Sequence, residues 1–202
     1  MEQAIIDQTI KALERNHFEV YFANNRQEAR DIFFQEIFDK IKPTTISWGD
    51  SETMKATGIL SEIEQRPECI LIRTFQDGYS RAQKTYWRRQ ALLADLFVTG
   101  TNALTRQGQL VNVDMVTRRH HLQAGTRHSV HRYQQITDDI EQAERIRTIA
   151  APLSAIRHPH LHTPCQTTRT CMNCQSVTAV TRDHHGKSLP KNESKLSLST
   201  NH

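Results

Sequence analysis

The sequence predicts an α/β fold: a layered, mainly parallel sheet with helices on both faces. Segments whose apolar residues recur at helical spacing alternate along the chain with short runs rich in β-branched and aromatic residues. This alternation is typical of parallel sheets, because helices connect the strands and cover both faces. With 202 residues, 37% of them hydrophobic, the chain is long enough to bury a substantial core in one domain.

The N-terminal segment predicts one helix followed by one strand. The helix is expected to end near Asn16, since Ile6, Ile10 and Leu13 fall at helical spacing. The strand is expected at residues 18–22, which alternate between apolar and polar positions.

A second helix is expected to begin at a capping box formed by Asn25 and Glu28 and to end at Lys42–Pro43. Its apolar side would consist of Ala29, Ile32, Phe33 and Ile37. Strands are expected at residues 44–48 and 69–72, which are rich in β-branched and apolar residues.

Residues 88–114 are the most specific stretch of the chain. In order, they hold the end of a helix that begins at Arg81, a buried strand at 96–98, a polar corner at 99–102, a turn at 106–108 and a strand at 110–114. So many elements in so few residues predict a crowded αβ corner.

A ligand pocket is predicted at two corners, Thr99–Asn102 and Gly49–Ser51, because ligands of open α/β sheets bind outside the carboxyl ends of the strands. The second corner combines a flexible residue, a hydroxyl N-cap and backbone N–H groups, which suit a small anionic metabolite. The candidate ligand-binding residues are Gly49, Ser51, Thr99, Gly100, Thr101, Asn102 and Asp114. The alternative is that both corners are structural turns and that Ser51 only caps its own helix.

A last amphipathic helix is expected to begin at a capping box of Asp138 and Glu141 and to be closed by Pro152. Its apolar positions would be Ile136, Ile140, Ala143 and Ile149. We therefore expect one α/β domain at residues 1–157 and a cysteine-bearing, partly disordered tail at 158–202.

The candidate metal ligands are Cys165, Cys171 and Cys174, which are spaced C-x5-C-x2-C. Thiols at this spacing can hold an iron–sulfur cluster or a zinc ion. Three ligands are one short of a tetrahedral site, and three reduced surface thiols are the alternative. Cys69 is expected to be a buried, inert core residue. Residues 1–4 lack the features of a signal peptide, so a cytoplasmic location with reduced thiols is expected.

The distribution of charge argues against a general phosphate-binding face. The formal net charge is +4; residues 115–135 contribute +4 and residues 177–202 contribute +2, which leaves −2 for the rest. Nucleic acid is therefore not an expected partner. Mean hydropathy is −0.64, and no apolar run approaches the length needed to cross a membrane, so no membrane partner is expected either.

Several motifs in the chain resemble the LUD domain family, which is named for lactate utilisation. They are Ile46–Ser51, the stretch 88–114, Ile149–Leu153 and Thr163–Cys165, the last pair being similar to small stand-alone members with a cysteine-bearing tail. The resemblance extends from the first helix to about Ser176. It implies a layered fold like that of ribose-phosphate isomerases and CoA transferases.

The resemblance implies a role in the oxidation of L-lactate to pyruvate, as a ligand-binding or accessory component beside iron–sulfur oxidoreductase subunits. The sequence contains no GxGxxG, no Walker lysine and no nucleophile–base motif, so whether the chain is itself an enzyme stays open. The alternative is a metal-dependent regulatory or nucleic-acid-binding module that uses the cysteine cluster and the basic stretch at 115–135.

Residues 115–135 depart from the family pattern, which has a glycine-rich turn and two apolar strands at this position. They have neither apolar periodicity nor a β-branched run. Codons permitted for residues 121–135, shifted by one nucleotide, encode TFRPAHVILFIGINK, and those for 192–202, shifted by two, encode RIKVVLINQP. Our hypothesis is that residues 115–135 and about 177–202 are both out of frame. We expect the sheet to lack apolar strands there and the chain to be poorly stable.

Overall fold

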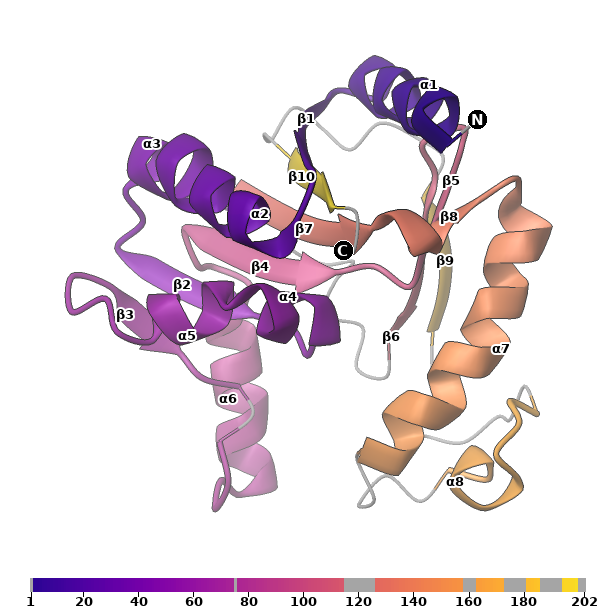
Figure 1. Cartoon of the computed structure of the whole chain (residues 1–202). Helices are drawn as coiled ribbons and strands as arrows, with labels where there is room; N and C mark the ends of the chain where they lie inside the picture. Colours follow the sequence, from indigo (N-terminus) through magenta and orange to yellow (C-terminus); the bar gives the residue numbers. More distant parts are fainter. Residues whose placement is uncertain are drawn as a thin grey trace.

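Two β-sheets organise the chain. The computed structural model describes residues 2–74, 76–114, 126–157, 163–172, 181–185 and 194–199. In Figure 1 the larger sheet crosses the centre, with helices α2 to α6 around it, and the smaller sheet lies beside α1 and α7. The predicted α/β architecture, with a mainly parallel sheet and helices on both faces, is confirmed.

The first sheet contains six strands in the order β1-β10-β7-β4-β2-β3, and every neighbouring pair is parallel. The strands are β1 (Phe18–Ala23), β2 (Thr45–Trp48), β3 (Ile70–Ile72), β4 (Leu96–Gly100), β7 (Thr126–Arg132) and β10 (Ser194–Ser199). Strand β4 is longer than the sequence suggests, so Thr99 and Gly100 belong to the strand and not to the corner that follows it.

Helices pack on both faces of this sheet, as the alternation along β4 shows. Leu96 and Val98 point into the cluster on one face, whereas Phe97 packs against Ala91 on the other. The first face is covered by α2 (Arg26–Ile32), the π-helical segment η1 (Phe33–Phe38), α3 (Asp39–Ile41), α4 (Glu52–Thr57) and α5 (Ile59–Ile63). The second face is covered by α6 (Arg81–Ala91), whose N-terminus has a capping box.

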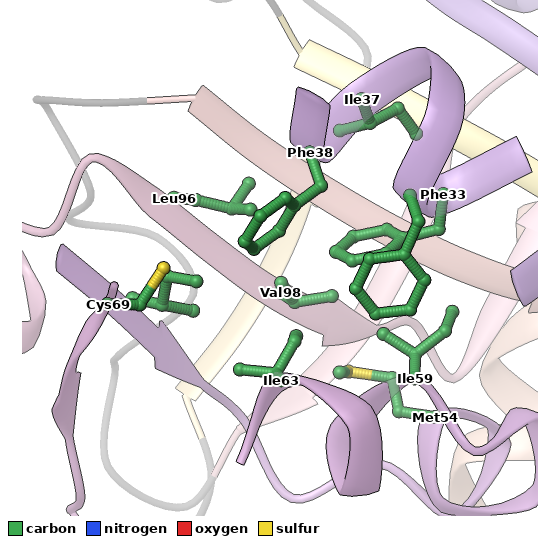
Figure 2. Packing of buried hydrophobic residues seen from close by; sticks show 11 residues of the cluster. Phe33, Ile37, Phe38, Met54, Ile59, Ile63, Cys69, Leu96 and Val98 are labelled. Atoms are coloured by element: carbon green, nitrogen blue, oxygen red, sulfur yellow. The ribbon is translucent and has the colours of Figure 1, made fainter. Parts of the chain in front are cut away.

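The main core lies under the first face, where Figure 2 shows aromatic side chains of η1 pointing toward β4. Phe33 is 1% exposed, and Ile63, Leu96 and Val98 are completely buried. Each such side chain contributes about 1.5–3 kcal/mol of transfer free energy. This packing fixes where β2 and β4 end, and therefore fixes the position of the two predicted corners.

The second sheet has the order β8-β5-β6-β9. Its strands are β5 (Ala103–Thr105), β6 (Leu110–Asp114), β8 (Ile136–Thr137) and β9 (Thr181–His185), and the short helix η2 (Tyr133–Gln135) precedes β8. Strands β5 and β6 form the expected hairpin, whose turn places Gly108 at φ +78°. A Cβ on Gly108 would lie 2.9 Å from the backbone carbon of Ala12, so the turn packs directly on the first helix.

Helices α1 (Glu2–Arg15) and α7 (Ile140–Arg157) cover the two faces of the second sheet. Leu13 of α1 packs on Leu104, and Ala143 of α7 packs on Ala103 and Val111. No helix among the described residues is long and apolar enough to cross a membrane.

The capping box predicted at Asn25 is correct in position but not in all its bonds, and the one predicted at Asp138 is shifted. The Asn25 side chain accepts from the backbone N–H of Glu28 at 2.9 Å, as expected. The carboxylate of Glu28 instead accepts from the N–H of Asn24. At α7 the box is formed one residue later than predicted, because Asp139 accepts from the N–H of Gln142 and the Gln142 amide oxygen accepts from the N–H of Asp138.

The prediction that Pro152 ends the last helix is wrong, because α7 continues to Arg157. Its final turn is held by tertiary contacts: Ala155 is buried, and its carbonyl accepts from Nε2 of Gln166 at 3.0 Å. The predicted apolar face is also only partly correct. Ile136 lies in β8, and Ile149 is 65% exposed.

In the stretch 115–135, which was expected to lack the family's apolar strands, Thr126–Arg132 forms the polar strand β7 between β10 and β4. Residues 115–125 lie outside the described part. Within the predicted tail, β10 lies between β1 and β7, and β9 pairs with β6. Parallel pairing uses backbone groups, so a polar segment can form a strand wherever both neighbouring strands satisfy its N–H and C=O groups.

Candidate functional site

The candidate site lies at the carboxyl ends of β2 and β4. These strands are neighbours with Trp48 paired to Val98, and all six strands end on the same edge because they are parallel. After β2 the chain turns into α4, whereas after β4 it leaves for the second sheet. Neighbouring strands whose chains diverge in this way mark the usual place for a ligand in an open α/β sheet.

The two predicted corners are in direct contact. The N–H of Gly49 donates to the carbonyl oxygen of Val98 at 2.9 Å. A Cβ at position 49 would lie 2.7 Å from Oγ1 of Thr99, so only glycine fits there without displacing the threonine. The structure therefore brings Gly49, Thr99 and Gly100 together on one edge.

Ser51 has the capping role that the sequence analysis gave as one of two interpretations. It is 8% exposed, and its hydroxyl oxygen accepts from the N–H of Met54 at 3.4 Å. The capped helix, α4, has six residues. Ser51 consequently orients the start of α4 beside Gly49.

Thr101 and Asn102 are tied to the second sheet. The Thr101 hydroxyl is buried and donates to the carbonyl of Val111 at 3.3 Å. The side chain of Gln135 donates to the carbonyls of Thr101 at 2.6 Å and Asn102 at 3.5 Å. These two residues join β4 to the second sheet, and no sequence pattern predicts their contact with Gln135.

Asp114 is the last residue of β6, where its backbone is paired with Thr181 of β9. It belongs to the second sheet, in the β5–β6 hairpin, and not to the first sheet, which contains β2 and β4. Asp114 is therefore positioned by the second sheet, whereas the contact between Gly49 and Thr99 lies at the edge of the first.

A group of charged side chains that was not predicted from the sequence surrounds the Gly49 corner. Nζ of Lys55 lies 2.9 Å from carboxylate oxygens of both Asp50 and Glu52. The guanidinium of Arg157, at the end of α7, lies 3.5 Å from Asp50 and 3.7 Å from Glu52. The Lys55 contacts follow helical spacing and could have been predicted, whereas Arg157 reaches the corner through the tertiary fold.

The hydrogen bond from Lys55 to Asp50, assisted by Glu52 and opposed by partial burial, raises the pKa of Lys55 above its usual 10.5. Lys55 is therefore a stable cation at neutral pH. It neutralises much of the negative charge that Asp50 and Glu52 bring to the corner.

The Trp48 side chain contacts Arg73, which directly follows the neighbouring strand β3. The Arg73 guanidinium lies 5.6 Å from the centroid of the Trp48 ring, within the range of a cation–π contact. Arg73 is also paired with Glu64 at 2.5 Å. These contacts fix the indole next to Gly49.

The cysteines are placed in two separate regions. Cys69 is buried in the main core, where its thiol donates to the carbonyl of Pro43, and burial raises the pKa of that thiol. Cys165, in the short helix α8 (Cys165–Thr168), is buried 3.3 Å from the hydroxyl of Thr163, and Cys171 is partly exposed. Cys174 lies outside the described residues.

A complete set of metal ligands is not found among the described residues, in which no three His, Cys, Asp or Glu side chains gather in a suitable cluster. Cys165 and Cys171 alone do not fit a zinc ion or an iron–sulfur cluster, which take about four ligands.

Comparison with known proteins identifies the family. The model of the LUD domain matches residues 6–188, while no curated protein matches the chain. The crystal structure of a DUF162 family protein from Deinococcus radiodurans is similar in fold, with a TM-score of 0.54 and 13% sequence identity over 100% of this chain and 99% of that one. Because the family model spans most of the sequence, the chain belongs to the LUD domain family.

Proposed function

We propose that this LUD-domain protein binds L-lactate or pyruvate at the β2–β4 edge, as a ligand-binding or accessory component of L-lactate oxidation. The observation that carries the proposal is the contact between the two strand ends, where the Thr99 hydroxyl lies against Gly49. Family membership supports a link to lactate utilisation. Together they favour a small carboxylate ligand bearing an oxygen at C2.

The chemistry favours a binding role over a self-sufficient catalytic one. Oxidation of L-lactate to pyruvate removes two electrons and two protons from the carbinol group at C2. The sequence has no dinucleotide-binding motif that would supply a hydride acceptor. We therefore assign the acceptance of electrons to iron–sulfur oxidoreductase subunits as partners.

Isothermal titration calorimetry with L-lactate, pyruvate and propionate tests the proposal, since propionate lacks the C2 oxygen. We expect L-lactate and pyruvate to bind and propionate to bind at least tenfold more weakly. Thr99→Val keeps the shape of the side chain but removes the hydroxyl. Of the two variants tested here, only Thr99→Val should weaken the binding of L-lactate. Thr148→Val, on the exposed side of α7, is the matched control. Equal affinity for all three acids would contradict the proposal.

For the cysteine motif we propose that Cys165, Cys171 and Cys174 hold an iron–sulfur cluster or zinc with a fourth ligand. Metal analysis and a visible spectrum of anaerobically purified protein should show bound metal. Cys171→Ser should reduce the metal content, whereas Cys69→Ala should leave it unchanged because Cys69 belongs to the main core. Protein that contains neither iron nor zinc after this purification would rule the metal out.

A nucleic-acid function receives less support than lactate binding. Two of the four arginines of the basic stretch, Arg127 and Arg132, lie in β7, which is paired on both edges inside the sheet. This part of the stretch is therefore not a free basic loop. A steep dependence of DNA or RNA binding on salt would reverse that judgement.

A further inference from the structure

We propose that Arg157 receives the carboxylate of the ligand at the β2–β4 edge. The inference rests on the proposed function and identifies the cation that would select an acid. Arg157 lies at the end of α7, a helix whose other half packs on the second sheet. Its guanidinium reaches across to the Gly49 corner, where it faces Asp50 and Glu52.

The charges around the corner leave Arg157 as the cation able to exchange partners. Lys55 makes two contacts of 2.9 Å with Asp50 and Glu52, which is hydrogen-bonding distance. The contacts of Arg157 with the same carboxylates are 3.5 and 3.7 Å, longer than the roughly 2.7–3.2 Å of a hydrogen bond. Lys55 balances one of the two carboxylate charges through hydrogen bonds, and Arg157 balances the other through longer contacts that an incoming carboxylate can replace.

The form of the guanidinium suits a carboxylate. Its planar fork of N–H donors can bind both oxygens of a carboxylate at once, which an ammonium group cannot do. The Arg157 side chain is 40% exposed, so a ligand can reach it from solvent. A partly exposed arginine whose contacts with Asp50 and Glu52 are longer than hydrogen bonds can form charge-assisted hydrogen bonds with an incoming carboxylate.

Arg157 and the Thr99 hydroxyl both lie around the Gly49 corner. Asp50, which faces the guanidinium, follows Gly49 directly, and Gly49 lies against the Thr99 hydroxyl. The carboxylate and the hydroxyl of L-lactate are on adjacent carbons. In this proposal one ligand meets the guanidinium with its carboxylate and the Thr99 side of the edge with its hydroxyl.

The test compares Arg157→Gln, Arg157→Lys and Arg145→Gln by calorimetric titration with L-lactate and with the neutral analogue lactamide. Arg145 is the matched control, because it lies on the same helix and is paired with Glu141 at 2.8 Å, away from the corner. Loss of a charged hydrogen-bonding pair should weaken L-lactate roughly ten- to hundredfold in Arg157→Gln. Lactamide binding should change by less than twofold, and Arg145→Gln should resemble the wild type with both ligands.

The outcomes separate this inference from the function on which it rests. If the wild type binds L-lactate and Arg157→Gln binds it equally well, the role of Arg157 is refuted and lactate binding stands. If the wild type binds neither L-lactate nor pyruvate, both proposals fall. Should Arg157→Gln not fold, Arg157→Lys decides: it keeps the charge but loses the fork, and unchanged L-lactate affinity would refute the assignment.

Discussion

Position 49 requires glycine because there is no room for a Cβ, and not because of its backbone conformation. It is not among the glycines with positive φ, yet a Cβ at this position would lie 2.7 Å from Thr99 Oγ1. Threonine is stiff at χ1, so the hydroxyl cannot move away without a rotamer change. The residue thus sets the separation between the ends of β2 and β4.

Gly49→Ala should accordingly destabilise the fold by about 1–3 kcal/mol, the usual cost of overpacking. The double variant Gly49→Ala/Thr99→Ala should recover most of that loss, because it removes the atom that the new methyl group meets. Urea unfolding of both variants and of Thr99→Ala alone measures the coupling. Strictly additive effects would show that the contact does not determine the cost.

The thiols differ in environment, and their reactivity should differ with it. Burial raises the pKa of Cys69 above its usual 9.0, so the folded state keeps this thiol neutral where the unfolded state ionises it. The contribution of the Cys69 thiol to the free energy of unfolding is therefore present below the unfolded pKa and is lost as pH rises through that value toward the folded pKa. Cys171, in contrast, is partly exposed.

After any bound metal has been removed, iodoacetamide at pH 8 should label Cys171 in the native protein and Cys69 only after denaturation. Peptide mapping by mass spectrometry distinguishes the two sites. Guanidinium-denatured protein provides the control in which both are labelled. Labelling of native Cys69 as fast as Cys171 would mean that the main core opens readily under these conditions.

Elements defined by local signals could be predicted from the sequence, and those defined by partners could not. Ser51 caps α4 and Gly108 forms the hairpin turn, because a hydroxyl at an N-terminus and a flexible residue in a turn act over a few residues. The extension of α7 past Pro152 depends on the bond from Gln166. Likewise, Arg157 joins the corner only through the packing of α7, which no spacing rule reveals.

Strand β7 is the element whose sequence least suits its position. It reads TRHSVHR, with one aliphatic residue, and it is paired on both edges inside a parallel sheet. Interior strands of parallel sheets are usually almost continuous apolar runs. Its polar composition is the physical reason why sequence patterns did not predict a strand there.

Replacing residues 121–135 with TFRPAHVILFIGINK should therefore raise the thermal midpoint and sharpen the transition, since the new side chains can be buried between the helical layers. A scrambled version with the same composition is the matched control, because it keeps the hydrophobicity and loses the order. Circular dichroism melting measures both. A replacement that melts no higher than the scrambled control would contradict this account of β7.

The molecule as a whole depends on two polar strands at the centre of its larger sheet. Strands β10 and β7 separate β1 from β4 and the rest of the main core. We expect a weakly cooperative thermal transition and a tendency to aggregate, because the sequences of these strands, TRHSVHR and SKLSLS, contain few apolar residues. A sharp, reversible melt in scanning calorimetry would refute this expectation and would weaken the hypothesis that 115–135 and 177–202 are out of frame.

Helix α7 connects two parts that the chain could otherwise have left independent. One half is anchored on the second sheet through Ala143, and the far end bears the guanidinium beside Asp50. Eighteen residues make a rod of about 27 Å, so a tilt of roughly 5° at the anchored half displaces the tip by about 2 Å. A partner protein that binds the smaller sheet and tilts α7 would thereby move Arg157 toward a bound acid or away from it.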